Sequence, residues 1–82
     1  QRLKGRRGEL GYTQLQFAEM VGQQYFTFVS QVENGVAKIP TDDLALWADS
    51  LGLDRYDFAK AYLKAVDPGL YRALFNNDPT IM

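Results

Sequence analysis

The side chains of this chain that could do acid–base or metal chemistry are mainly carboxylates, because the sequence contains no histidine and no cysteine. Without them the chain lacks the usual zinc ligands, thiolate nucleophiles, disulfides and the commonest general base. Of the ten carboxylates, Glu9, Glu19, Asp42 and Asp43 could suggest a metal site or an acid–base pair, but we expect them to cap helices or to add solubilising charge. The sequence therefore predicts no enzyme, no metal site and no cofactor.

A second kind of chemistry is hydrogen bonding by uncharged polar side chains. Thr27 and Gln31 are four residues apart, so on a helix they share one face. A glutamine on such a face can bond the N6 and N7 edge of adenine in the major groove of DNA. The alternative for this pair is two polar residues that are simply solvated.

Charge is divided unevenly along the chain, although the net charge is only −1. Residues 1–38 hold five basic and three acidic side chains, a net +2, and residues 39–82 hold four and seven, a net −3. A positive first half fits a protein that turns one side toward phosphates. For Arg2, Lys4, Arg6 and Lys38 a solvated charged face remains an equal alternative.

Helix start and stop signals predict an all-α fold of five to six helices. Thr13 is a natural N-cap, and Asn34-Gly35 supplies a left-handed helix stop. The helices are expected at about residues 2–10, from Thr13 to Gly22, from Tyr25 or Phe26 to Glu33, from Thr41 or Asp42 to Gly52, from Asp54 to Val66, and at 69–75. Residues from Asn76 to Met82 are expected to form a frayed tail.

Apolar side chains at helical spacing give the predicted core. They are Phe17, Ala18, Val21, Val29, Val32, Leu44, Trp47, Ala48, Leu51, Phe58, Tyr62 and Val66. Asp54 is the expected N-cap of the fifth helix, and Asp67-Pro68 is typical of the start of a sixth. The chain is long enough for one domain, with a core over residues 1–53 and a C-terminal extension over residues 54–82.

Two motifs carry a resemblance to a known family. Thr13-Gln14-x-x-Phe17-Ala18-Glu19-x-Val21-Gly22 is followed by Ser30-Gln31-Val32-Glu33-Asn34-Gly35. They resemble the XRE/Cro/CI-type helix-turn-helix family of bacterial and phage repressors, whose pattern is TQ-x-x-LA-x-x-(V/L)-G and then (V/I)-x-x-(I/L)-E-N-G. Ala48-Asp49-x-Leu51-Gly52 matches the helix that follows, so the resemblance covers about residues 2–53. It implies a lambda repressor-like domain that binds double-stranded DNA.

The resemblance implies roles for individual residues. Base contacts are expected from the outward positions of the third helix, which are Phe26, Thr27, Ser30 and Gln31. Contacts to the DNA backbone are expected from Gln14, Gln23, Gln24, Arg6 and Lys38. Arg7 and Glu33 match a structural pair that ties the first helix to the end of the third.

The chain departs from the family pattern at two places. The spacing from Gly22 to Gly35 is one residue longer than usual, so Gln23-Gln24 predict a four-residue connection and an altered entry angle for the third helix. Phe26 replaces the usual glutamine or serine. Its ring cannot hydrogen-bond a base edge, although it can touch a thymine methyl group. Packing under the connection is the alternative for this ring.

The C-terminal extension is rich in aromatic and leucine side chains. They are Tyr56, Phe58, Tyr62, Leu63, Leu70, Tyr71, Leu74 and Phe75. Such residues complete the core or form a subunit interface, and we expect both. The predicted dimer surface consists of Tyr62, Leu70, Tyr71, Leu74 and Phe75. A homodimer would double the phosphate contacts of a chain with few basic residues.

Two functions stay open. The first is a sequence-specific DNA-binding transcriptional regulator, a dimeric repressor that inserts Phe26 to Glu33 into the major groove of a palindromic operator. The second is a protein-interaction module, such as an antitoxin or accessory factor, that uses the same helices to hold a partner protein. No apolar run approaches the ~20 residues that cross a bilayer, so we expect no membrane partner and a cytoplasmic, nucleoid-associated protein.

Overall fold

The structure is a computed structural model that describes residues 2–75, all of them in helices, turns or short connections without a strand. The helices are α1 (Arg2–Glu9), α2 (Gln14–Met20), α3 (Phe26–Glu33), α4 (Leu44–Ser50), α5 (Arg55–Val66) and α6 (Pro68–Phe75), with a 3-10 turn η1 (Thr41–Asp43) before α4. The prediction of an all-α fold is confirmed. The predicted tail from Asn76 to Met82 lies outside the described residues.

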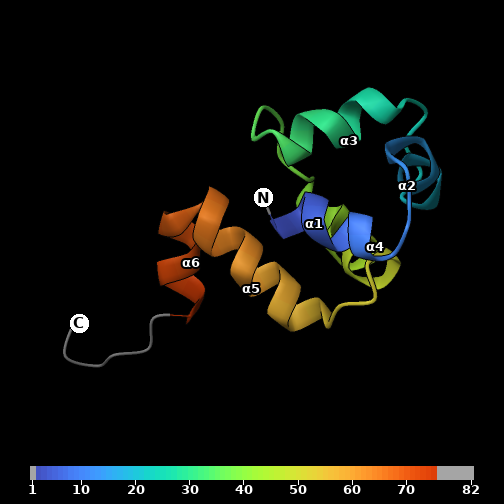
Figure 1. Ribbon diagram of the computed structural model, residues 1–82. Helices are drawn as coiled ribbons and strands as arrows, with labels where there is room; N and C mark the ends of the chain where they lie inside the picture. The colour runs from blue at the N-terminus through green and yellow to red at the C-terminus, as the bar shows by residue number, and fades with distance from the viewer. Residues whose placement is uncertain (1, 76–82) are drawn as a thin grey trace.

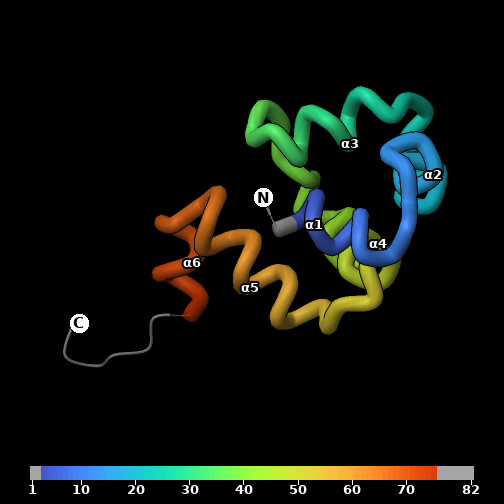
Figure 2. Tube along the Cα trace, viewed as in Figure 1, coloured from blue at the N-terminus to red at the C-terminus, as the bar shows by residue number. Residues whose placement is uncertain are grey.

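Figure 1 shows α1 in the middle of the molecule, with α3 on one side of it and α5 on the other. α2 packs against α3, and α5 packs against α4 and α6. The tube in Figure 2 shows that α6 turns back beside α5, away from the pair α2 and α3. The outward side of α3 is therefore not covered by the C-terminal helices.

The core is built around the indole of Trp47 on α4, which is completely buried. The ring of Phe17 meets it edge-on at 5.1 Å between centroids, and the ring of Phe28 does so at 6.2 Å. The other buried apolar side chains are Leu3, Ala18, Val21, Val29, Val32, Ile39, Ala48, Leu51 and Leu63. The predicted inward positions of α2, α3 and α4 are confirmed, except that Leu44 is only half-buried.

The start of α2 is closed by a reciprocal pair of side-chain bonds. The hydroxyl of Thr13 accepts a hydrogen bond from the backbone N–H of Gln16 at 3.0 Å. The side-chain carbonyl of Gln16 accepts one from the N–H of Thr13 at 2.9 Å. This capping box satisfies two amides that the helix itself leaves open. The predicted N-cap is confirmed, and Gln16 is an addition to it.

The predicted caps of the last two helices are also present. The carboxylate of Asp54 accepts a bond from the N–H of Asp57 at 2.9 Å, which caps α5. The carboxylate of Asp67 accepts one from the N–H of Leu70 at 3.2 Å in the first turn of α6. Short aspartate side chains reach these amides from an N-cap position without loss of helical geometry.

The start of α4 differs from the prediction. Neither Thr41 nor Asp42 caps a helix with its side chain; both belong to the 3-10 turn, and no side-chain bond caps that turn or α4. The N–H of Asp43 instead bonds the carbonyl of Pro40 at 2.9 Å. Because proline fixes its φ at a value that opens a tight turn, the backbone supplies the bond that a side-chain cap would give.

Tyr62 ties α5 to the core. Its hydroxyl accepts a hydrogen bond from the backbone N–H of Ile39 at 2.8 Å, and its ring stacks on that of Phe58 at 6.0 Å. Both rings pack against the core cluster, whereas Val66 is only half-buried. Leu63, the most buried residue of α5, was not among the predicted inward positions. Tyr62 is thus already used within the domain, which disfavours its assignment to a dimer surface.

Candidate nucleic-acid interface

α2 and α3 are joined by a compact connection of five residues, Val21–Tyr25. The predicted length of four residues is wrong by one, because α2 already ends at Met20. Gly22 takes a φ of 74°, and the N–H of Gln23 bonds the carbonyl of Ala18 at 2.8 Å. A left-handed glycine followed by such a long backward bond is a common helix C-terminus. The following residues are free to start a new helix in another direction.

α3 has a buried face and an open face. Val29 and Val32 point into the core with 0% and 3% exposure. Thr27 and Gln31 are exposed, and Phe26 is 47% exposed. Four of the eight residues of α3 were predicted to contact bases. Of these only Ser30 is half-buried, and its hydroxyl lies 3.5 Å from the side-chain amide of Asn34.

The first turn of α3 has no side-chain cap. Its N-cap residue, Tyr25, makes no capping bond and is 65% exposed. Open backbone N–H groups and the positive end of the helix dipole attract anions such as phosphate. Gln23, half-buried, and Gln24, exposed, lie in the connection just before this turn. Tyr25 was not among the predicted site residues, although it is the first of two exposed aromatic residues at the start of α3.

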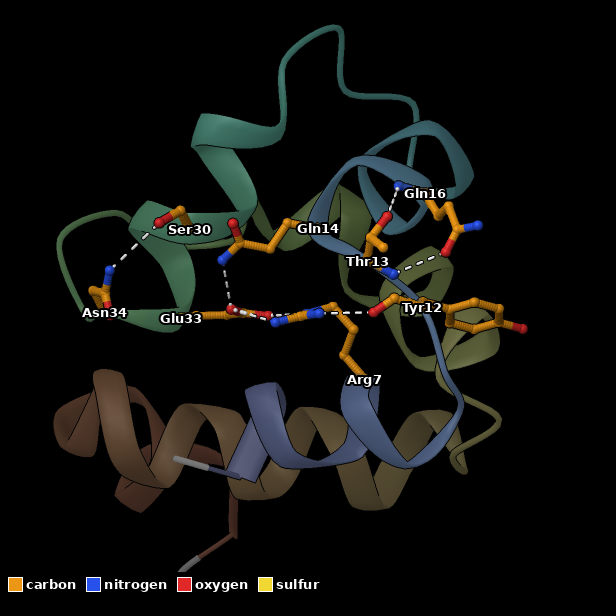
Figure 3. Close-up of polar contacts among 8 residues, drawn as sticks. All are labelled: Arg7, Tyr12, Thr13, Gln14, Gln16, Ser30, Glu33 and Asn34. Atoms are coloured by element: carbon orange, nitrogen blue, oxygen red, sulfur yellow. Dashed lines mark hydrogen bonds and ion pairs between the residues drawn. The ribbon is translucent and has the colours of Figure 1, made fainter.

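The other end of α3 is held by a buried polar network, drawn in Figure 3. The carboxylate of Glu33, whose residue is only 4% exposed, accepts bonds from Arg7 Nε at 2.5 Å and Arg7 Nη2 at 3.2 Å. It also accepts a bond from Gln14 Nε2 at 3.0 Å. The remaining guanidinium nitrogen, Arg7 Nη1, donates to the carbonyl of Tyr12 at 2.7 Å. One carboxylate thereby connects α1, α2 and α3.

The electrostatics of Glu33 keep it charged. Burial alone raises the pKa of a carboxyl group, because the charged form loses its hydration. The hydrogen bonds from Arg7 and Gln14 and the positive charge of Arg7 outweigh that effect, and the pKa of Glu33 lies below its ordinary value of 4.5. A forked guanidinium with a second donor beside it is the partner set that a buried carboxylate requires.

The residues predicted to contact the DNA backbone differ in exposure and in the hydrogen bonds that they already make. Gln14 is half-buried; one amide hydrogen goes to Glu33, and the second remains for another acceptor. Lys38 is exposed in the segment between α3 and η1. Gln14 is thus bonded to the last residue of α3, and Lys38 follows that residue by five positions in the chain.

The guanidinium of Arg6 is bonded to other residues of the domain. Its Nε donates to the carbonyl of Leu51 at 2.9 Å, and its Nη1 lies 3.3 Å from the carboxylate of Glu9. Leu51 is the C-cap of α4, so the guanidinium sits at the negative end of that helix. The phosphate contact of Arg6 stays a prediction, and these two bonds disfavour it.

Neither a metal site nor a membrane segment is found in the described part of the chain. Residues 2–75 hold no group of three or more acidic side chains that could bind a metal ion. Among the described helices, none has the length and apolar character to cross a membrane.

Comparison with known proteins bears on the same region. A family model described as helix-turn-helix matches residues 3–58, more than half of the chain. The matched range contains α2, α3, the connection between them and the polar network around Glu33. No curated protein and no solved structure matches the chain.

Proposed function

The chain belongs to the XRE/Cro/CI-type helix-turn-helix family, a family of DNA-binding transcription regulators with a lambda repressor-like fold, and from that premise we propose that it is a dimeric repressor that reads a palindromic operator with α3. The family is a regulatory one and not a family of enzymes. α2 and α3 are then the two helices of the motif, and α3 is the recognition helix.

One observation carries the proposal: α3 buries Val29 and Val32 and leaves Phe26, Thr27 and Gln31 exposed on a side that no C-terminal helix covers. A helix with its side chains is about 10–12 Å across, and the major groove is about 12 Å wide. The open face of α3 therefore fits the groove.

Individual contacts follow from the exposed side chains. Gln31 can make the paired bond to adenine N6 and N7, and Thr27, one turn before it, can reach a neighbouring base. Phe26 offers its ring to a thymine methyl group. Ser30 lies between the open and buried faces, and its hydroxyl, which accepts from Asn34, still has a hydrogen to donate to a base edge.

Phosphate contacts would flank this helix. Gln14 can donate its second amide hydrogen to a phosphate while Glu33 holds the first. Gln23 and Gln24, beside the open amides of the first turn, can bind a second phosphate, and Lys38 a third. A phosphate contact by Arg6 is disfavoured, because its guanidinium is already bonded to Leu51 and Glu9.

A dimer compensates for the low basic charge of the chain. Two copies on one site double the phosphate contacts, and the two α3 helices would lie ~34–36 Å apart in successive major grooves. Bound across a promoter, such a dimer represses by occlusion. A protein with this role works in the cytoplasm on the nucleoid.

The second candidate is the protein-interaction module, an antitoxin or accessory factor. It is favoured by the neutral, aromatic start of α3, where Tyr25 is 65% and Phe26 47% exposed. Exposed aromatic side chains of this kind are typical of protein interfaces.

A footprint of the purified protein on the DNA upstream of its own gene, at physiological salt, separates the two. A protected site with two symmetric halves supports the repressor. If no site is protected and a protein partner co-purifies in fixed ratio, the repressor is contradicted and the protein-interaction module is supported.

A further inference from the structure

α3 begins with two exposed aromatic side chains that the domain itself does not use. Tyr25 is the N-cap residue, and Phe26 is the first residue of the helix. Within residues 2–75 neither ring stacks on another ring or lies beside a cation, and neither packs against the core cluster. Phe28 differs from both, because it packs on the core and meets the ring of Trp47 edge-on. The fold therefore leaves the rings of Tyr25 and Phe26 available to a ligand.

The backbone holds this aromatic pair at the very start of α3. Tyr25 is extended, with φ −124° and ψ 139°, and its carbonyl accepts a hydrogen bond from the N–H of Phe28 at 3.4 Å. Figure 1 shows this end of α3 beside α2, on the side away from α6. The N-terminal residues of a recognition helix are the ones that contact base edges. The two rings thus lie where α3, in the proposed function, enters the major groove.

The exposed face of α3 carries no charge. Residues 20–32 include no lysine, arginine, aspartate or glutamate. Arginine and lysine are the side chains that most often read guanine, through its O6 and N7 atoms, and this face offers neither. Its fully exposed side chains are those of Phe26, Thr27 and Gln31. Because glutamine favours adenine, the discrimination by this face rests on bonds to adenine and on apolar contact.

The phenyl ring of Phe26 has one apolar target in the major groove. Each base pair presents hydrogen-bond donors and acceptors there, and thymine alone of the four bases adds an apolar group, its C5-methyl. A cytosine methylated at C5 carries the same group at the same position of the pyrimidine, whereas cytosine and uracil carry a hydrogen. A ring that makes no hydrogen bonds therefore distinguishes pyrimidines by this methyl group.

We propose that the start of α3 reads the C5-methyl group of a pyrimidine, with Phe26 as the contacting ring, so that cytosine methylation regulates binding to the half-site. 5-Methylcytosine then replaces thymine at this position, and unmethylated cytosine does not. Tyr25 covers the contact from the side of the connection, and its hydroxyl can bond a neighbouring phosphate. Removal of the ring and the methyl group from water supplies the preference.

The pair read by Phe26 is separate from the pair read by Gln31. The two residues are five apart, which is about 7.5 Å along a helix, whereas successive bases of one strand are about 3.4 Å apart. Their contacts can therefore fall on different base pairs. The adenine preference at the Gln31 position stays unchanged when the Phe26 position changes from thymine to 5-methylcytosine.

Methyl reading rests on the proposed function, because α3 must enter the major groove. It adds a chemical modification of DNA that the site recognises. In the family pattern glutamine or serine is usual where this chain has Phe26, so the property belongs to this chain and not to the pattern.

Uracil substitution tests the methyl contact without knowledge of the operator. DNA upstream of the protein's own gene is amplified once with thymidine triphosphate and once with deoxyuridine triphosphate, so that the two probes differ in methyl groups alone. The wild-type chain should bind the uracil probe about fourfold more weakly for each half-site, or about fifteenfold as a dimer, since each half-site loses one buried methyl group.

Two variants show whether Phe26 is responsible for this difference. Phe26→Ala should bind the thymine and uracil probes nearly equally. Tyr56→Ala, which removes an exposed aromatic side chain on α5, is the matched control and should keep the wild-type ratio. Circular dichroism verifies that each variant is folded.

5-Methylcytosine tests whether the methyl group alone is read. In the protected site, the thymine whose methyl group matters is replaced in both half-sites by 5-methylcytosine or by cytosine, each paired with guanine. The 5-methylcytosine duplex should bind within about twofold of the thymine duplex, and the cytosine duplex about fifteenfold more weakly. Phe26→Leu, which keeps an apolar side chain, should retain this order, and Phe26→Asn should lose it.

Methyl reading and the proposed function can fail separately. Equal binding of the thymine and uracil probes by the wild-type chain, or a wild-type ratio in Phe26→Ala, would overturn methyl reading and keep the DNA-binding regulator. A 5-methylcytosine duplex as weak as the cytosine duplex would do the same. A wild-type chain that binds none of these probes contradicts both, and the exposed rings would then be assigned to a protein partner.

Discussion

The side-chain amide of Gln14 donates a hydrogen bond of 3.0 Å to the buried carboxylate of Glu33, which fixes the first residue of α2 to the last residue of α3. Arg7 holds the same carboxylate from α1. The angle between the two helices is therefore set by three polar side chains at one end of α3 as well as by the apolar face below it. Of the residues that we propose to contact DNA, only Gln14 takes part in this polar network.

Removal of Arg7 should destabilise the fold strongly. Arg7→Ala leaves the Glu33 carboxylate buried without its charged partner, which typically costs about 3–5 kcal/mol of unfolding free energy. Urea unfolding followed by circular dichroism measures it. Arg72→Ala, at an exposed arginine on α6, is the control and should stay within about 0.5 kcal/mol of wild type. An Arg7→Ala variant as stable as this control would show that the ion pair is not structural.

Stability should fall in acid through Glu33. The pKa of Glu33 is depressed in the folded state, so the unfolded chain binds the proton more readily, and folding stability falls as pH decreases. The contribution is complete above the ordinary value of 4.5 and is lost as pH falls below it, through the lower pKa of the folded state.

Urea midpoints between pH 7 and pH 3 measure this loss in wild type and in Glu33→Gln. The variant should be less stable at pH 7 and should vary less with pH. Asp49, whose pKa is also lowered by its bond with Arg55, contributes equally to both curves. If the urea midpoints of the two proteins changed with pH in parallel, Glu33 would not be the titrating group.

Truncation of Gln31 should relax sequence preference at one base pair in each half-site. Gln31 is exposed on α3, so Gln31→Ala removes a base contact without loss of core packing. The cost should be about 1–3 kcal/mol of discrimination at that position, with other positions unchanged. Competition binding with single-base variants of the operator measures it. Equal weakening on every sequence would reassign Gln31 to the DNA backbone.

Truncation of Lys38 should act on all sequences alike. A phosphate contact contributes through counterion release, so Lys38→Ala should reduce the slope of log K against log salt by about 0.9 for each subunit, or about 1.8 for a dimer on its site, and leave the ranking of sites unchanged. Titrations at several salt concentrations give both quantities. Arg72→Ala, at an exposed arginine on α6, is the comparison and should leave the slope unchanged. An unchanged slope for Lys38→Ala would place this residue outside the interface.

Much of the fold could be predicted from the sequence because its signals are local. The Thr13 and Asp54 caps act over three residues, and Trp47, Ala48 and Leu51 reveal their common face by spacing. Gly35, at a φ of 77°, ends α3 where a left-handed residue was expected. Each of these features depends on a few neighbouring residues only.

What the sequence did not show depends on contacts between distant residues. The bond from Gln14 to Glu33 spans 19 residues, and that from Ile39 to the Tyr62 hydroxyl spans 23. Helical spacing alone could not distinguish Tyr62 as part of the domain from Tyr62 as part of a dimer surface. The five-residue connection before α3 was missed because the last turn of α2 can end at either of two neighbouring residues without changing the sequence pattern.

The central claim is that α3 reads DNA as one half of a symmetric pair, and selection from a random duplex library at physiological salt tests it most directly. Purified full chain should enrich a two-fold symmetric site whose half-sites lie about 10–10.5 base pairs apart or a multiple of it. The Gln31→Ala variant should enrich the same spacing with one position relaxed in each half-site. Failure of the wild-type protein to enrich any sequence, or enrichment of a single unpaired half-site, would contradict the account.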